Sequence, residues 1–183
     1  MRELSLHLLD MLQNSREAGA TDVIAEVIED TRRDEMVLRV TDNGRGVPVE
    51  QLPHLFDPFY TTRNTRHVGL GLPLLKAAAE RAGGTATVAS APGRTTVEAR
   101  FVHSHLDRAP LGDVADTLLA MMLDDTAPRL RYRHVANGNR FEVDSAEIRR
   151  LLDGMPIRQT EAYAWLRSYL EEGIRTVRQG LAP

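Results

Sequence analysis

The chain has 183 residues, 42% hydrophobic and 27% charged, an ordinary composition for one globular domain with or without a small appendage. Its 23 basic and 26 acidic side chains give a formal net charge of −3, so no basic excess points to nucleic acid or to an anionic membrane surface. The absence of cysteine excludes disulfides, thiolate metal sites and a cysteine nucleophile. No apolar run approaches the ~20 residues of a membrane span, and acids interrupt the N-terminal segment, so we expect a cytoplasmic protein.

The first part of the sequence predicts the order α-β-β-loop-α-β-β, from helical periodicity, strand alternation and glycine turns. The predicted elements are a helix at 3–18 closed by Gly19, strands at 22–30 and 36–42, a helix at 72–84, and strands at 85–90 and 95–103. This order is typical of the α+β class. It favours a two-layer α/β sandwich with a mixed, mostly antiparallel sheet and helices on one face.

The pattern changes after residue 103, where a linker-like stretch leads into a second group of elements. A helix at 112–125 precedes a hairpin signalled by Asn137-Gly138, a capping-box pattern starts a helix at Ser145, and an amphipathic helix ends the chain. We therefore expect a domain at 1–103 and a small helix-hairpin-helix appendage at 104–183, which docks a partner or packs on the first domain. The aromatic residues of the last helix are expected in the core: Tyr163, Trp165 and Tyr169.

Polar residues recur along the first helix at spacings of 4, 3, 4 and 3, which places them on one stripe. They are Glu3, His7, Asp10, Asn14 and Glu17. For an isolated helix, a solvated face is the ordinary interpretation. Asn14 is a poor helix former, however, and two glycine motifs elsewhere indicate a ligand instead.

The two glycine motifs are "VTDNGRGVP" at 40–48 and "HVGLGLPLL" at 67–75. In the first, a strand ends at Asp42, whose carboxylate could accept a hydrogen bond from an exocyclic amine, and glycines follow that allow close approach to a ligand. In the second, two glycines precede a helix N-terminus, whose free N–H groups suit phosphate. The second motif is not a P-loop, because it lacks Gly-Lys-Ser/Thr at the right spacing, and it does not directly follow a strand as a dinucleotide fingerprint would.

In this order the motifs resemble those of the ATPase superfamily of gyrases, heat-shock chaperones, histidine kinases and mismatch-repair ATPases, which share the Bergerat nucleotide fold. "DMLQNSREAGAT" resembles the N box of that superfamily, "DNGRGV" its G1 box, "LFDPFYTTR" the F box of histidine kinases and "GLGLPLL" their G2 box. "PGRTTVEARF" is similar to the closing strands. The resemblance covers residues 1–102 and identifies the chain as a stand-alone histidine-kinase-like ATPase.

The resemblance implies ATP and Mg²⁺ as cofactors, with Asn14 as the Mg²⁺ ligand and Asp42 as the acid that reads the adenine amino group. The other implied binding residues are two glycine pairs, two lid arginines and one of two threonines: Gly44 and Gly46, Gly69 and Gly71, Arg63 and Arg66, and Thr95 or Thr96. The arginines would pair with phosphate oxygens, although solvated loop charges fit them equally well.

Asp10 stands where hydrolytic relatives carry a glutamate that orients or activates water, so Asp10 is the candidate catalytic residue. Aspartate is one methylene shorter, and a displacement of about 1 Å can cost ~10²-fold in rate, so slow hydrolysis is expected. We also expect no phospho-accepting helix before this domain. The only lysine is Lys76, which disfavours a dimeric clamp that would need a later lysine at the γ-phosphate.

The leading hypothesis is a Mg·ATP-binding enzyme that transfers the γ-phosphate to a partner protein or hydrolyses ATP slowly. The alternative is a nucleotide-gated binding module with little turnover. The layout is similar to small stand-alone ATP-binding proteins for which a redox or signalling enzyme is the expected partner, with no nucleic acid and no membrane. On an extended strand His103, His105 and Asp107 would share one face, as in part of a metallo-hydrolase site, but a polar exit from the strand is the favoured interpretation.

Overall fold

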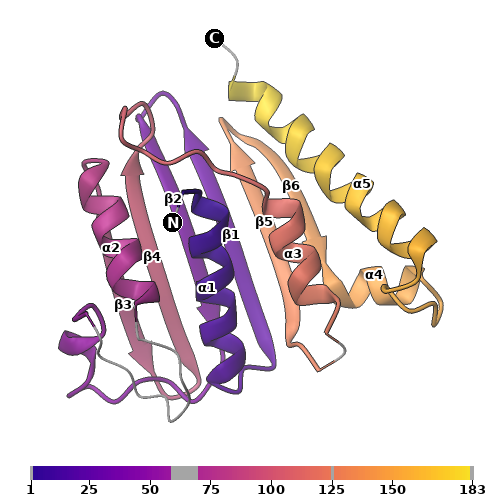
Figure 1. The fold of residues 1–183 in the computed structure, drawn as a ribbon, viewed down its shortest axis with the longest axis horizontal. Coiled ribbons are helices and arrows are strands. Elements are labelled where there is room, and N and C mark those ends of the chain that lie inside the picture. The colour runs from indigo at the N-terminus through magenta and orange to yellow at the C-terminus, as the bar shows by residue number, and fades with distance from the viewer. Residues whose placement is uncertain (1, 59–69, 125, 182–183) are drawn as a thin grey trace.

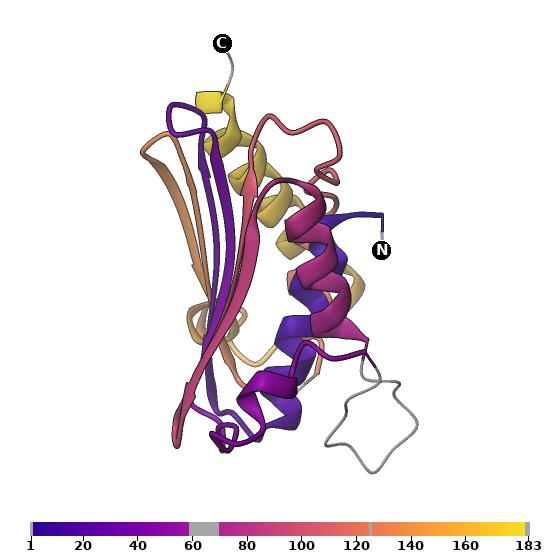
Figure 2. The same cartoon turned by 90° about the vertical axis from the view of Figure 1, so that its left-hand side faces the viewer.

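The computed structural model describes residues 2–58, 70–124 and 126–181, which form a sheet with helices on one face (Figures 1 and 2). The helices are α1 Leu4–Glu17, α2 Gly71–Arg81, α3 Val114–Met122, α4 Ser145–Leu151 and α5 Thr160–Arg178, with short 3₁₀ turns η1 Leu52–His54 and η2 Gln179–Leu181. The strands are β1 Asp22–Asp30, β2 Glu35–Asp42, β3 Thr85–Ala91, β4 Arg94–Val102, β5 Arg129–Ala136 and β6 Asn139–Asp144. The predicted α+β sandwich is confirmed. None of the helices in these three segments is long and apolar enough to cross a membrane.

The strands form one six-stranded sheet in the order β3-β4-β2-β1-β5-β6. Neighbours are antiparallel except β1 and β5, which run parallel with Asp22 opposite Arg129 and Glu29 opposite Ala136. The C-terminal hairpin therefore continues the sheet that begins in the first half of the chain. The division of the chain at residue 103 stays a prediction, since it concerns what each part does.

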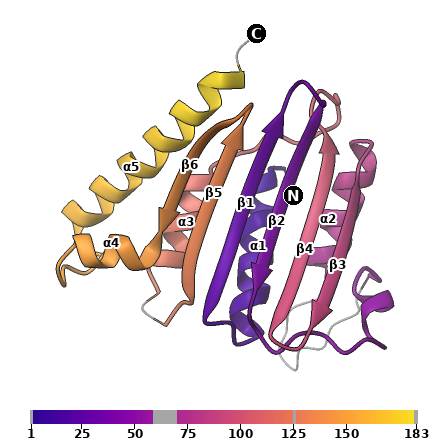
Figure 3. The same cartoon turned by 180° about the vertical axis from the view of Figure 1, so that it is seen from behind.

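The core lies between the sheet and the helical layer. Strand alternation sends apolar side chains such as Val27 and Leu38 toward the helices, where they meet the buried Leu8 and Leu12 of α1. The helices leave the opposite face of the sheet uncovered (Figure 3). This face carries ion pairs between strands. Arg39, for example, donates to Glu26 at 3.0 Å and to Glu98 at 2.6 Å. The polar residues that alternate with the apolar ones along the strands thus pair with each other on this face.

Two sequence expectations for the C-terminal part are wrong. Asp144, rather than Ser145, caps α4 by accepting from the Ala146 N–H at 2.9 Å, while the Ser145 hydroxyl accepts from the Leu130 N–H. Trp165 and Tyr169 do not enter the core. They are 45% and 40% exposed and stack on each other with ring centroids 5.6 Å apart. The reason is that α5 lies along β6 at the sheet edge, where one side of the helix faces away from the protein (Figure 1).

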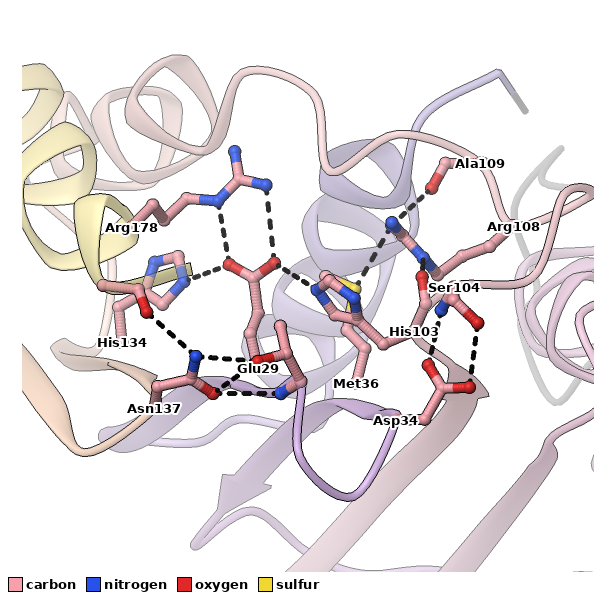
Figure 4. A network of polar contacts seen from close by, with 12 residues as sticks. Glu29, Asp34, Met36, His103, Ser104, Arg108, Ala109, His134, Asn137 and Arg178 are labelled. Atoms are coloured by element: carbon pink, nitrogen blue, oxygen red, sulfur yellow. Dashed lines mark hydrogen bonds and ion pairs between the residues drawn. The ribbon is translucent and has the colours of Figure 1, made fainter. Parts of the chain in front are cut away.

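A buried carboxylate ties α5 to the sheet (Figure 4). Glu29 on β1 accepts from Arg178 Nε at 2.8 Å, lies 2.9 Å from His134 Nε2, and lies 3.3 Å from His103 Nε2. Burial alone would raise the pKa of Glu29, but the hydrogen bond from His134 and the charge of Arg178 outweigh it and lower the pKa to about 2. Because an ionised carboxylate only accepts hydrogen bonds, Nε2 of His134 is the donor to Glu29, while Nδ1 lies 2.9 Å from the Tyr132 hydroxyl.

Candidate functional site

The polar stripe of α1 faces protein rather than solvent along its middle. Asp10 and Asn14 are half-buried, and Gly71 at the start of α2 lies so close that an added Cβ would stand 3.3 Å from Asp10 Oδ2. The side of α1 that bears the predicted N box thus meets the glycine turn of the predicted G2 box. The interpretation of the stripe as a solvated face is wrong at His7, which is only 2% exposed.

His7→Leu should remove a loss of stability that the wild-type protein shows in mild acid. Burial, then the charges of the N-terminus and of Arg81, lower the pKa of His7 from 6.5 to about 4, and Nδ1 has no hydrogen-bond partner. The unfolded chain therefore takes up a proton at this residue before the folded chain does. Stability is full above pH 6.5 and falls as the pH drops toward 4. Urea unfolding at several pH values should give a flatter profile for His7→Leu across this window, and an unchanged slope would contradict the assignment.

Asp42 is held at the end of β2 by two donors from different elements. Its Oδ2 accepts from the Ser15 hydroxyl at 2.9 Å, and its Oδ1 accepts from the Gly44 N–H at 2.8 Å. The residue is 7% exposed. Each carboxylate oxygen can accept more than one hydrogen bond, so the group keeps acceptor capacity for a ligand donor. Ser15 was missed from the sequence, although it directly follows Asn14 on the buried side of α1.

The two glycines after Asp42 let the loop pass between α1 and the β3–β4 turn. A Cβ on Gly44 would lie 2.8 Å from Ala18 Cβ and 2.9 Å from the Ala18 carbonyl oxygen. Gly46 has a φ of +78°, and its Cβ would lie 2.7 Å from the Ala91 carbonyl oxygen. Both positions therefore require glycine, the second also because of its left-handed backbone. These close contacts are with protein, and the expected approach of the loop to a ligand stays a prediction.

The structure separates the two threonines between which the sequence left a choice. Thr95 lies opposite Asp42 in the β2–β4 register and is buried, with Oγ1 2.8 Å from the Ser90 hydroxyl, which accepts from the Val47 N–H. Thr96 lies opposite Thr41, and their hydroxyls are 3.0 Å apart on the open face of the sheet. Thr95 therefore lies beside Asp42, whereas Thr96 lies on the other face of the sheet. Ser90, which links Thr95 to the glycine loop, was not predicted.

The remaining predicted residues fall into two groups. Arg63, Arg66 and Gly69 lie outside the described residues. β4 ends at Val102, so the extended strand that would align the 103–107 side chains is not formed. His103 instead turns to Glu29, and His105 Nδ1 accepts from the Asp107 N–H at 3.1 Å. Within 2–58, 70–124 and 126–181, no group of three or more His, Cys, Asp or Glu residues is placed to hold a metal ion.

The fold and the site define a class of nucleotide-binding protein: an acid at a strand end, a glycine loop packed beside it, and a helix N-terminus against a polar helix face. The sequence profile of the family described as "Histidine kinase-, DNA gyrase B-, and HSP90-like ATPase" matches residues 2–108, more than half of the chain. The chain belongs to this family, which confirms the resemblance stated from its motifs, and membership implies that it binds ATP.

Curated relatives place the similarity within histidine kinases. The chain is 38% identical over 96 residues to the signal transduction histidine-protein kinase AfsQ2 of Streptomyces coelicolor, covering 50% of this chain and 17% of that protein. It is 51% identical over 57 residues to the sensory histidine kinase/phosphatase NtrB of Rhizobium leguminosarum bv. phaseoli, covering 31% and 15%. The chain therefore spans less than a fifth of the length of these relatives.

A solved structure supports the fold alone. The crystal structure of the N-terminal domain of a DNA repair protein superposes with a TM-score of 0.52 at 12% identity. The superposition covers 78% of this chain and 52% of that one. Because 78% is more than residues 2–108 contain, the shared architecture extends beyond the part matched by the family profile.

Proposed function

We propose that the protein binds ATP with Mg²⁺ and either transfers the γ-phosphate to a partner protein or hydrolyses ATP slowly. The observation that carries the proposal is the Asp42 carboxylate, fixed by Ser15 and Gly44 at the end of β2. Buried Thr95 lies opposite it on β4. This arrangement offers an anionic acceptor for the adenine amino group beside a glycine-lined loop.

The residues present fit the nucleotide and its metal. The close packing of Gly44 and Gly46 leaves backbone rather than side chains along the loop that would pass under the base. Asn14 supplies an amide oxygen on a half-buried helix face, and Mg²⁺ takes oxygen ligands while it keeps several waters. Mg²⁺ would neutralise phosphate charge when bound. Gly71 places backbone rather than a side chain beside Asp10 at the N-terminus of α2, and a helix N-terminus suits phosphate.

Asp10 is the residue on which turnover depends in this proposal. It is half-buried on α1 beside the start of α2, where it would orient the attacking water or the acceptor group. Phosphoryl transfer rests mainly on positioning and charge stabilisation, so a carboxylate that stands too far away slows the reaction without preventing binding.

A second candidate function is a nucleotide-gated binding module, in which ATP changes a partner surface and is seldom consumed. The short side chain of Asp10 favours it. So does the C-terminal part at 104–183, which presents the exposed Trp165–Tyr169 stack that a docking region needs. The partner in either case is an unidentified protein, with redox and signalling enzymes as the class to test first. A cytoplasmic location is part of the same proposal.

Asp10 variants distinguish the two functions. With γ-labelled ATP, Asp10→Asn should retain nucleotide binding but lose about 10²–10⁴-fold in phosphate release or partner labelling, the usual range for a positioned acid or base. Asp10→Glu should keep or raise the rate, because it restores the longer carboxylate of the hydrolytic relatives. If wild-type protein binds ATP but gives neither free phosphate nor labelled partner, the binding module is the better description.

A further inference from the structure

A row of polar side chains crosses the ends of three neighbouring strands beside the candidate site. Thr95 on β4 lies directly opposite Asp42 on β2 and, on its other side, directly opposite Ser90 on β3. Residues that stand opposite each other in paired strands point to the same face, so all three side chains lie on the helix face of the sheet. Ser90 is the member of the row that the proposed function does not use.

Ser90 joins the glycine loop to Thr95. Its Oγ accepts from the Val47 N–H at 2.8 Å and lies 2.8 Å from Thr95 Oγ1. The loop that leaves β2 at Asp42 therefore returns to the same row at Ser90. The position of the loop end and the hydrogen bonding of a buried hydroxyl both depend on this one serine.

The Val47 N–H favours one direction for this chain of hydrogen bonds. A backbone N–H can only donate, so Ser90 Oγ accepts one bond from it. If Ser90 in turn donates to Thr95, its hydroxyl accepts one bond and donates one, and such chains strengthen their members. If Thr95 donated instead, Ser90 would accept two bonds, and its own proton would need a further acceptor. The first arrangement leaves the Thr95 proton to be donated to another group.

The acceptor for that proton fits a bound base. Thr95 is only 8% exposed, and buried hydroxyls are hydrogen-bonded, so a ligand seated at Asp42 is well placed to accept from it. The Asp42 carboxylate accepts and the Thr95 hydroxyl donates. Adenine presents the complementary pair, because its amino group donates and the ring nitrogens on either side, N1 and N7, accept. Guanine carries an oxygen acceptor in place of the amino group, and this oxygen would face the carboxylate.

We propose that Ser90 is a positioning residue for base recognition, which orients the Thr95 hydroxyl as a donor to a ring nitrogen beside the adenine amino group. The inference rests on the proposed function, because it takes ATP as the ligand of the site at Asp42. Ser90 acts through Thr95 and does not itself contact the base.

The test compares the effect of Ser90→Ala on the dissociation constants of ATP, 1-deaza-ATP and 7-deaza-ATP, measured by calorimetric titration in the presence of Mg²⁺. Each analogue replaces one of the two ring nitrogens by carbon and so removes one acceptor. Ser90→Ala should weaken ATP binding about 3- to 10-fold, the usual contribution of one neutral hydrogen bond. It should weaken one analogue by the same factor and leave the other unchanged, which identifies the nitrogen that Thr95 contacts.

Two further variants separate this role from a structural one. In a Thr95→Val background, Ser90→Ala should have no further effect on ATP binding, because the hydroxyl that it orients is already absent. Thr87→Ala is the matched control, since it removes a hydroxyl from the open face of the same strand, opposite Glu98. It should leave all three dissociation constants unchanged.

Unchanged ATP affinity in Ser90→Ala would overturn the proposal. So would an equal loss for ATP and both analogues, or the same loss in the Thr95→Val background, because either result would mean that Ser90 only holds the loop at Val47. In these cases the wild-type protein still binds ATP, and the proposed function stands. A wild-type protein that binds no ATP would instead contradict the proposed function, and this inference with it.

Discussion

Asp42→Asn should weaken Mg·ATP binding by about 10- to 100-fold. A hydrogen bond to a charged group contributes about 1.5–3 kcal/mol, and every 1.4 kcal/mol changes affinity tenfold. The amide has one acceptor oxygen in place of two, and the Gly44 N–H already occupies one carboxylate oxygen at 2.8 Å. The new NH₂ group would also face donors, either Ser15 or the adenine amine. The substitution changes few atoms, so the fold should persist.

Calorimetric titration of ATP measures this effect directly, and two threonine variants provide matched controls. Thr95→Val removes a buried hydroxyl opposite Asp42 and should also weaken binding. Thr96→Val removes a hydroxyl on the open face and should leave the affinity unchanged. Equal affinity of wild type and Asp42→Asn would show that Asp42 does not read the base. If only Thr96→Val lowered the affinity for ATP, the nucleotide would bind on the open face of the sheet, which would contradict the proposed site.

The sequence predicted the elements around the site because their signals are local. Apolar alternation marks β1 and β2, and Gly19 indeed takes the left-handed φ of +74° expected after α1. Asp42 and its glycines form a contiguous motif, so their proximity required no knowledge of the tertiary structure. The same reasoning could not choose between Thr95 and Thr96. Neighbouring strand residues point to opposite faces, and the choice depends on the register with β2.

Contacts between residues that lie far apart in the chain could not be predicted from the sequence, for a related reason. The Asn137-Gly138 turn predicts a hairpin but does not say which strand the hairpin joins, and β5 joins β1 in parallel. Ser15 and Ser90 carry no signature of their own, because serine is common and their partners lie far along the chain. The aromatic face of α5 was placed in the core because periodicity shows which residues share a face but not what covers it.

Glu29→Gln should lower the free energy of unfolding by about 3 kcal/mol, because it removes the charge of a buried carboxylate whose folded pKa is about 2 rather than 4.5. The Glu29 side chain is fully buried and is the shared acceptor of Arg178, His134 and His103, so the substitution leaves positive charge without its counter-charge (Figure 4). Arg178 comes from α5, so the amides of this helix should lose protection from hydrogen exchange before those of β1. Glu172→Gln is the control, because Glu172 pairs with Arg175 on the exposed side of α5 and should not matter measurably.

The pH dependence of stability tests the same residue independently. The folded pKa of Glu29 is about 2, below its ordinary value of 4.5, so the unfolded chain binds the proton first as the pH falls. The stabilisation is therefore complete above pH 4.5 and is lost between 4.5 and 2, with a total of ~3 kcal/mol. His7 acts in the higher window from 6.5 to 4, so the two residues can be assigned separately. Glu29→Gln should lack the lower step and keep the upper one. A variant that retains the full wild-type acid slope below pH 4.5 would show that Glu29 does not carry it.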